Sequence, residues 1–212
     1  MTTSPRRALI VIDVQNEYVT GDLPIEYPPV EASLVNIGRA IDAAHAQSVP
    51  VIVVQHLSPP SSPLFARGSH GAALHPVVAS RAYDHFIEKA LPSSFAGTDL
   101  ADWLAAHEID TLSVVGYMTQ NCNVSTVLHA LHAGMKVEYL TDATGAVPYE
   151  NEAGYASAEE IHRTFTVVMQ ARFAAVVSTD AWIDAVKAGK PLAGGSIAAS
   201  NKKARARAGV SA

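Results

Sequence analysis

The sequence predicts a doubly wound α/β fold, in which a mainly parallel sheet of about six strands carries helices on both faces. Short apolar runs alternate with helical patterns along the chain, which is typical of parallel sheets with crossover helices. The runs are continuously apolar, as expected of strands buried on both faces. The chain has 212 residues, of which 49% are hydrophobic and 17% charged, so it can bury a substantial core.

The first half of the chain opens this alternation. Residues 8–13 and 51–55 are apolar runs that predict buried strands, and residues 83–88 predict a short strand. Apolar residues at helical spacing predict a helix over 30–47. The connection 58–82 contains several Pro, Gly and Ser residues, and a connection this long inside a compact domain is usually functional.

The second half continues the pattern, with clearer end signals for its helices. Thr98 is a suitable N-cap, Ser157 and Glu160 form a capping box, and Gly134 stands where a helix would end. We predict strands at 111–116, 136–140 and 174–178, and helices at 99–107, 121–133, 157–170 and 180–188.

A change of composition divides the chain near its end. Residues 1–188 are predicted to form one domain, and 189–212, rich in Gly, Ala, Ser and Lys, a flexible basic tail. Four of the fifteen basic residues lie in 202–207, so the rest holds eleven basic against twenty acidic side chains, a net charge of −9. Such an acidic body argues against a nucleic-acid partner.

The apolar residues near the N-terminus are too few for export or membrane insertion. The run 8–12 ends at Asp13 after five residues, whereas a signal peptide needs about 7–15 apolar residues and a membrane span about 20. We therefore expect a cytoplasmic protein without a membrane partner.

Three chemically distinctive residues follow predicted strands, and ligands of open parallel sheets bind at those strand ends. Asp13 would be partly desolvated there, which suits a general base. Lys89 would supply a positive charge that lowers the pKa of a nearby thiol. Cys122 lies at a strand-to-helix turn, where unpaired N–H groups favour a thiolate and can hold an oxyanion.

Each of these residues also has a plainer interpretation. Asp13 could cap a turn, and Lys89 could be a solvated strand end. Cys122 is the single cysteine, which excludes an internal disulfide and leaves a buried inert thiol, a nucleophile or a lone metal ligand. The occurrence of all three residues at strand ends favours a catalytic group.

In this order, Asp13, Lys89 and Cys122 resemble the Asp–Lys–Cys triad of the isochorismatase-like cysteine hydrolases. The likeness covers residues 8–187, nearly the whole chain apart from the tail, and identifies 1–188 as an isochorismatase-like hydrolase domain. The similar strings are IVIDVQN at 10–16, the lysine segment at 88–100, GYMTQNCNVST at 116–126, TDA at 141–143, and His162.

The resemblance implies a mechanism. Asp13 would take the proton of Cys122, Lys89 would stabilise the charged site, and the thiolate would attack a carbonyl to form an acyl-enzyme that water releases. The family's non-proline cis peptide would join Tyr117 to Met118 and aim the backbone N–H groups of Met118 and Cys122 at the oxyanion.

The resemblance also bears on the reaction. True isochorismatases of the family lack the nucleophilic cysteine, so Cys122 favours cleavage of an amide, carbamoyl or ureido C–N bond. Two alternatives stay open: a vinyl-ether hydrolase like the namesake enzyme, and a non-catalytic redox-sensing or binding module.

No metal or other cofactor is expected, because the chain departs from the family's metal site. Nicotinamidases of the family carry an Asp two residues before a His, followed by two further His. Here Val54 stands two residues before His56, and His70 and His75 follow. Three His could still bind zinc, so this question stays open at the level of sequence.

We expect an apolar, partly aromatic pocket for a small-molecule substrate. The family's habit of assembling, together with small residues on the helices, implies a homo-oligomer. The candidate substrate-binding residues, which flank the catalytic positions in the sequence, are Tyr18, His56, Leu57, Phe65, Phe95 and Tyr117.

Overall fold

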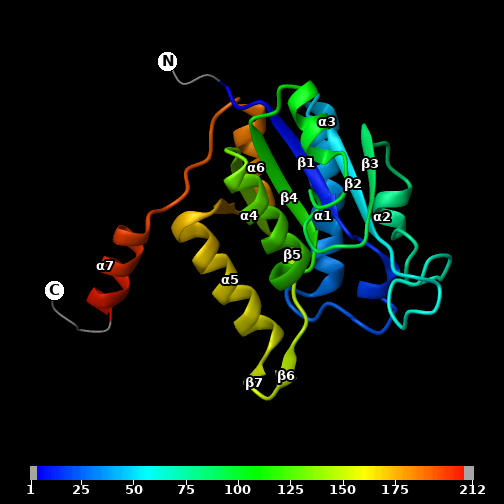
Figure 1. The fold of residues 1–212 in the computed structure, drawn as a ribbon. Helices are drawn as coiled ribbons and strands as arrows, with labels where there is room; N and C mark the ends of the chain where they lie inside the picture. The colour runs from blue at the N-terminus through cyan, green and yellow to red at the C-terminus, as the bar shows by residue number, and fades with distance from the viewer. Residues whose placement is uncertain (1–3, 208–212) are drawn as a thin grey trace.

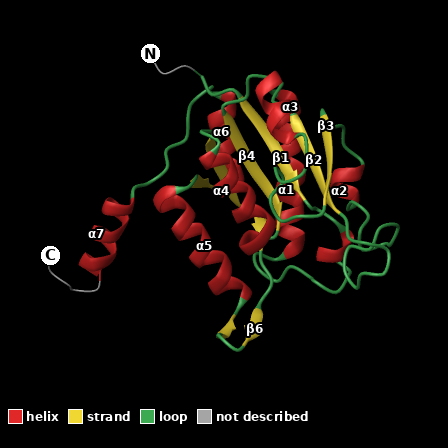
Figure 2. Ribbon diagram, in the orientation of Figure 1, coloured by secondary structure: helices red, strands yellow, loops and turns green. Residues whose placement is uncertain are grey.

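A computed structural model describes residues 4–207 and confirms the doubly wound fold (Figures 1 and 2). Its main sheet has six parallel strands in the order β3-β2-β1-β4-β5-β8. The strands are β1 (Arg7–Ile12), β2 (Val51–His56), β3 (His85–Lys89), β4 (Thr111–Tyr117), β5 (Lys136–Gly145) and β8 (Ala175–Val177).

Helices cover both faces of this sheet, as Figure 2 shows. One face carries α1 (Val30–Ala46), α2 (Pro76–Ala79) and α6 (Thr179–Lys187). The other carries α3 (Leu100–Ala106), α4 (Val124–His132) and α5 (Ala158–Arg172).

The central strand β1 is buried on both faces because its alternate side chains enter two separate cores. Leu9 belongs to the apolar cluster that contains Trp182 of α6. Ile10 belongs to the cluster on the opposite face, together with Leu104 of α3. A continuous apolar run therefore forms a strand here because neither face meets water.

The strand order reverses between β1 and β4, and this topology positions the site. From β1 the chain runs outward to β2 and β3, then returns to place β4 on the other side of β1. In open parallel sheets, ligands bind outside the carboxyl ends of the strands at such a switch point. Asp13, which follows β1, and the turn that follows β4 meet at this point.

Several short elements have no counterpart among the predicted ones. They are the 3₁₀ turn η1 (Asn16–Tyr18), α2, and the hairpin of β6 (Tyr149–Asn151) and β7 (Gly154–Ala156). Each has only three or four residues, too few to show a hydrophobic period. A longer helix, α7 (Ile197–Arg207), lies where we expected the chain to fray, and its Ala, Lys and Arg residues are good helix formers.

The helix signals were accurate to within about one residue. The capping box of Ser157 and Glu160 is confirmed at the start of α5. The N-cap of α3 is Asp99 rather than Thr98, whose hydroxyl instead accepts a hydrogen bond from Leu100 N at 3.3 Å. Within residues 4–207, none of the helices is both long and apolar enough to cross a lipid bilayer.

Candidate active site

A buried ion pair forms the floor of the candidate site. Lys89, at the end of β3, places its Nζ atom 2.7 Å from Oδ2 of Asp13, and neither side chain is exposed to solvent. Asp13 has a positive φ of 50°, so the backbone turns sharply as it leaves β1. Asp13 follows β1 and Lys89 ends β3, and these two strands are separated by β2. His56, the last residue of β2, therefore lies between them.

Lys89 also contacts the thiol and an imidazole. Its ammonium lies 3.2 Å from Sγ of Cys122 and 3.3 Å from Nδ1 of His56, in addition to the Asp13 carboxylate. An ammonium group has three N–H donors, and here three acceptors surround it. Lys89 therefore links the three residues into one charged cluster.

The nucleophile turn follows β4 without an intervening loop. The peptide bond between Tyr117 and Met118 is cis, as expected, and a π-helical turn, η2 (Thr119–Asn123), leads directly into α4. Gly116 has a φ of 103°, and a Cβ at that position would clash with the carbonyl oxygen of Ile12. Glycine thus lets β4 approach β1 closely just before the turn that carries Cys122.

Buried polar side chains hold this turn from behind. Nδ2 of Asn123 donates to the carbonyl oxygen of Gly116 at 2.8 Å and to the Tyr139 hydroxyl at 3.3 Å. The Tyr139 hydroxyl in turn donates to Oγ1 of Thr119 at 3.0 Å. Both ends of the π-helical turn are therefore tied to the sheet, which fixes the position of Cys122 between them.

His162, on α5, completes this network. Its Nδ1 lies 2.9 Å from Oγ1 of Thr119 and its Nε2 lies 3.1 Å from Oγ1 of Thr141. Burial lowers the pKa of His162 to about 4, so the ring is neutral near pH 7. The matched histidine thus supports the nucleophile turn and does not enter the substrate cavity.

The electrostatics of the thiol differ from our expectation. Burial, followed by the neighbouring Asp13 carboxylate, raises the pKa of Cys122 above its usual value, although Lys89 acts in the opposite direction. Burial lowers the pKa of Lys89, but the Asp13 carboxylate and Cys122 outweigh it and leave that pKa raised. The raised pKa of the thiol favours its protonated form beside the ion pair of Lys89 and Asp13.

His56 is held in one orientation and one tautomer. Burial and the charge of Lys89 lower its pKa, so the imidazole is neutral near pH 7. Because charged Lys89 must donate, Nδ1 of His56 accepts and Nε2 carries the proton. Gln15 clamps the backbone of His56 through hydrogen bonds of 2.8 and 2.9 Å.

A cavity of about 370 Å³ opens above the thiol. Three of the predicted substrate-binding residues line it, namely Tyr18, His56 and Phe65. The ring centroids of Tyr18 and Phe65 lie 5.2 Å apart, and those of His56 and Phe65 also 5.2 Å. The remaining lining residues are Leu23, Ser58, Leu64, Met118, Asn121, Cys122 and Tyr149.

The other predicted pocket residues lie elsewhere. Tyr117 is fully buried behind Tyr18, because its hydroxyl bonds to Oγ of Ser33 at 2.6 Å. Phe95 stacks on the imidazole of His129, with ring centroids 4.7 Å apart. Leu57 lines two other hollows, which it shares with Arg67 and Glu88. Proximity in sequence to a catalytic residue did not distinguish core from cavity at these three positions.

Sequence reasoning missed a buried acid that shapes the cavity wall. Glu17 follows Asn16 in the IVIDVQN string, and its Oε1 accepts from Asp22 N at 2.7 Å, while its Oε2 accepts from Phe65 N at 3.4 Å. It thereby joins two loops that are far apart in the sequence. A buried acid directly after a predicted strand-end motif is a signal that could have indicated this role.

The histidines considered for a metal do not converge. His70 is exposed, and His75 uses Nδ1 to accept from Val77 N at the start of α2. Within residues 4–207, the cluster with suitable ligand atoms is Asp13, His56 and Cys122, whose atoms lie within 4.8 Å of one another. The Lys89 ammonium already contacts all three, so these residues do not fit the metal site of the nicotinamidases.

Comparisons with known proteins agree with this geometry. The Isochorismatase domain model matches residues 7–181. The chain is 70% identical to an isochorismatase-like protein from Burkholderia xenovorans LB400, and the crystal structure of that protein aligns with a TM-score of 0.97 over 98% of this chain and 100% of the other.

Two curated relatives extend the comparison. A secreted isochorismatase effector from Verticillium dahliae is 31% identical over 137 residues, which are 65% of this chain and 71% of the relative. The nicotinamidase of Escherichia coli is 30% identical over 181 residues, which cover 68% of this chain and 84% of the relative. The second of these relatives is an amide hydrolase by name.

Proposed function

The chain belongs to the isochorismatase family, and from this premise we propose that it is a cysteine hydrolase of a small molecule, cleaving an amide, carbamoyl or ureido C–N bond through a thioester on Cys122. The observation that carries the proposal is the cluster at the cavity floor. There one ammonium, that of Lys89, contacts both the Asp13 carboxylate and the Cys122 sulfur.

The first step makes the thioester. Sγ of Cys122 attacks the substrate carbonyl carbon and its proton passes to Asp13, since the raised pKa of the thiol disfavours a standing thiolate. The backbone N–H groups of Met118 and Cys122 hold the oxyanion. When the tetrahedral intermediate collapses, the C–N bond breaks and Asp13 returns the proton to the leaving nitrogen.

The second step releases the acid. Asp13 takes a proton from a water molecule, which attacks the thioester carbonyl carbon. The C–S bond then breaks and the sulfur recovers the proton, so the resting thiol is restored. Lys89 stays charged throughout and stabilises whichever neighbour is anionic, because its raised pKa prevents it from giving up a proton.

The size and lining of the cavity support a small, largely apolar molecule as the substrate. A volume of about 370 Å³ lies at the lower end of the range for small-molecule pockets. Tyr18 and Phe65 offer aromatic walls, while the Nε2–H of His56 and the side chain of Asn121 offer polar contacts.

The proposal is tested with a panel of small amides, carbamoyl compounds and ureido acids. We expect wild-type protein to release amine or ammonia from at least one class, and Cys122→Ala to lose the activity by a factor of about 10⁶. Intact-mass measurement after rapid acid quench should show an acyl group on wild type and none on Cys122→Ala. Equal turnover by the two proteins would refute the mechanism.

The two alternatives give different results in the same experiment. A redox sensor needs an accessible thiol with a lowered pKa, whereas Cys122 is buried and its pKa is raised. A vinyl-ether hydrolase of the isochorismatase type would turn over isochorismate even as Cys122→Ala. Isochorismate turnover by that variant, with no amide hydrolysis by wild type, would replace our proposal.

A further inference from the structure

A row of contacts joins the segment that carries Lys89 to the helix that follows Cys122. We propose that Thr126 of α4, acting with Ser94, is a positioning residue for the ammonium that lies beside the Cys122 sulfur. The placement of the ammonium stands on these contacts alone, whereas its effect on turnover rests on the proposed function.

Among the residues of the cluster, Lys89 has the least support from the sheet. Its strand β3 lies at the edge, with β2 as its neighbour on one side, whereas Asp13 follows the central strand β1. On the β2 side, the carbonyl oxygen of Lys89 accepts from Leu57 N at 2.9 Å. The chain then leaves the sheet, so contacts from elsewhere have to hold the segment 90–100.

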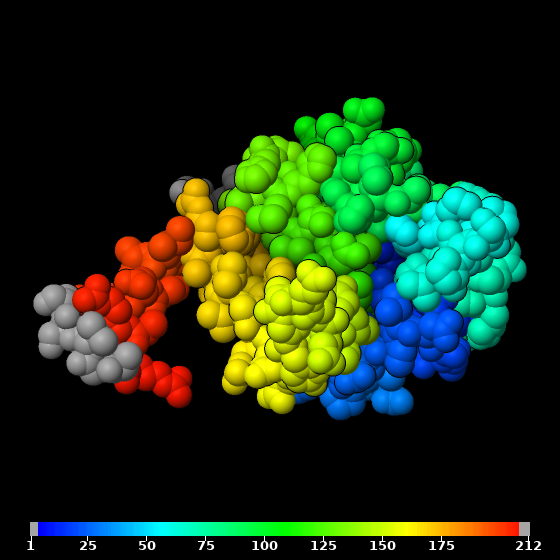
Figure 3. All heavy atoms as spheres, turned by 60° about the horizontal axis from the view of Figure 1, so that its bottom comes forward, coloured from blue at the N-terminus to red at the C-terminus, as the bar shows by residue number. Residues whose placement is uncertain are grey.

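Helix α4 and the turn before it supply such contacts along one face. Cys122, Thr126 and His129 are four and three residues apart, a spacing that brings side chains to the same side of a helix. At one end of this row, Sγ of Cys122 lies 3.2 Å from Nζ of Lys89. At the other end, Nδ1 of His129 lies 3.2 Å from Oγ of Ser93. Figure 3 shows this outer end on the surface, where α4 and the segment after β3 lie side by side in shades of green.

The central contact of the row is fully buried. Oγ1 of Thr126 accepts a hydrogen bond from Ser94 N at 3.0 Å and donates to Ser94 Oγ at 3.1 Å, and both residues are 0% exposed. The carbonyl oxygen of Ser94 accepts from the Thr98 hydroxyl at 2.6 Å. The backbone of Ser94 is therefore held at both its amide and its carbonyl. Without the Thr126 hydroxyl a buried N–H would lose its acceptor, and the segment would shift to find another.

These hydrogen bonds are connected with the reacting atoms through short stretches of chain. Thr126 lies one helical turn beyond Cys122, and Ser94 lies five residues beyond Lys89. Burial and the Asp13 carboxylate raise the pKa of the thiol, and Lys89 opposes them. A greater distance between the ammonium and the sulfur would weaken this opposition and leave the thiolate less stable.

The first test measures the thiol directly and needs no substrate. Cys122 is the single cysteine, so intact mass follows its alkylation by iodoacetamide from pH 6 to pH 9. We expect Thr126→Val to react about five- to tenfold more slowly than wild type at each pH, because a displaced Lys89 stabilises the thiolate less. A merely structural loosening would expose the buried thiol and accelerate the alkylation.

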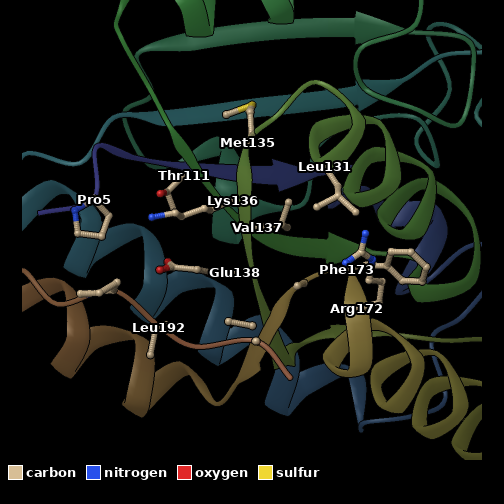
Figure 4. A pocket seen from close by; sticks show the side chains of 14 residues that line it. Pro5, Thr111, Leu131, Met135, Lys136, Val137, Glu138, Arg172, Phe173 and Leu192 are labelled. Carbon is tan, nitrogen blue, oxygen red and sulfur yellow. The ribbon is translucent and has the colours of Figure 1, made fainter. Parts of the chain in front are cut away.

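Two further variants and one control accompany this measurement. Thr126→Ser retains the hydroxyl and should react at the wild-type rate. Ser94→Ala keeps the backbone hydrogen bond to Thr126 and should slow the reaction only about two- to threefold. The matched control is Thr111→Val, which removes the hydroxyl of a buried threonine at the opposite end of β4 and should leave the rate unchanged. Thr111 lines a cavity of about 300 Å³ at the amino edge of the sheet (Figure 4).

The second test uses a substrate that the wild type hydrolyses. Thr126→Val should lower kcat about 10- to 100-fold and change KM less than about twofold, because a misplaced ammonium impairs the reaction and not the binding of substrate. Thr126→Ser should restore kcat. Circular dichroism at the assay temperature would establish that both variants are folded.

Equal or faster alkylation of Thr126→Val would overturn the inference, and so would an equal slowing in Thr111→Val. If Thr126→Val does not fold, Ser94→Ala decides the question, and a wild-type rate of alkylation in that variant would overturn the inference. Failure of the proposed function is a separate result. Wild type would then hydrolyse none of the amides, carbamoyl compounds and ureido acids, while the slower alkylation of Thr126→Val would still be expected.

Discussion

Two buried ion pairs lie at opposite edges of the same sheet, and they differ in how completely their atoms are bonded. At the carboxyl edge, Lys89 and Asp13 are 0% exposed and lie 2.7 Å apart. At the amino edge, Arg7 and Glu138 are 3% exposed and lie 2.8 Å apart.

The pair at the amino edge is saturated. Arg7 holds both carboxylate oxygens of Glu138 through three hydrogen bonds of 2.8–3.1 Å. Oε2 of Glu138 also accepts from Ser113 Oγ at 2.8 Å and from Trp182 Nε1 at 3.0 Å. Such an arrangement stabilises a fold, since every buried polar atom has a partner.

The pair at the carboxyl edge is incomplete. Among the described residues, the Asp13 carboxylate meets the Lys89 ammonium and the Cys122 thiol, while Lys89 divides its donors among three different acceptors. Burial without full satisfaction is unfavourable for folding, but it leaves a carboxylate able to take a proton from a neighbouring thiol. Two ion pairs with similar burial and similar N–O distances thus serve stability at one edge of the sheet and chemistry at the other.

The largest expected effect is a loss of activity when the ion pair at the carboxyl edge is altered. Asp13→Asn should lower kcat/KM by about 10⁴-fold on any substrate found for the wild type, because the amide cannot accept the thiol proton. Steady-state kinetics would measure this, with Asp142→Asn as a control, since Asp142 caps Thr179 through its carboxylate. If Asp13→Asn kept more than a tenth of the activity, the ion pair at the carboxyl edge would not have the catalytic role that sets it apart from the pair at the amino edge.

The second effect should appear in stability and not in kinetics. Arg7→Met leaves Glu138 buried without its charge partner and should lower the free energy of unfolding by about 3–5 kcal/mol. Urea unfolding followed by circular dichroism would measure the change, while kcat at 10 °C should stay near the wild-type value. Arg7→Met/Glu138→Gln should recover much of the loss, because no charge is then stranded.

A third effect concerns acid stability, and His162 is the group responsible. Its pKa of about 4 lies below the usual 6.5, so the unfolded chain binds more protons than the folded one between those values. Its contribution of about 3 kcal/mol is present above pH 6.5 and is lost as the pH falls toward 4.

His162→Gln should flatten this part of the stability curve, with its carboxamide preserving hydrogen bonds to Thr119 and Thr141. Urea midpoints measured from pH 7 to pH 4 would show the difference between the two proteins. Parallel curves for wild type and variant would contradict the assignment of this pH dependence to His162.

The smallest effect tests the third acceptor of Lys89. Nitrogen-15 NMR of the imidazole should show His56 protonated at Nε2 and bare at Nδ1 in wild type, and Lys89→Met should shift this tautomer balance. His56→Phe should raise KM about 2- to 12-fold with little change in kcat, as expected for the loss of one hydrogen bond. If Nδ1 of His56 carried the proton in wild type, Lys89 would donate hydrogen bonds only to Asp13 and Cys122.

The chemical identity of the site could be predicted because it depends on local sequence. Asp13, Lys89 and Cys122 each follow an apolar run, and parallel strands bring their carboxyl ends to one edge. Gly116, which permits the close approach of β4 to β1, precedes the nucleophile turn in the chain itself. Local patterns of this kind hold wherever the strand is placed in the sheet.

The cavity wall could not be predicted in the same way. Leu23, Leu64 and Tyr149 reach the cavity on loops or on a hairpin that has no periodic pattern. Phe95 and Tyr117, which lie nearer the catalytic residues in the sequence, are held in the core by His129 and Ser33. Which aromatic ring faces a substrate depends on such distant partners.

The sequence by itself determined the order of strands and helices, the acidic body with its basic end, and the three residues of the cluster. Only the tertiary structure decided that burial raises the pKa of the thiol, that Nδ1 of His56 faces Lys89, and that the C-terminal segment contains the helix α7. The physical reason is one of range. Hydrophobic period and capping act over a few residues, whereas a pKa, a tautomer or the direction of an arm depends on burial and charges contributed by remote parts of the chain.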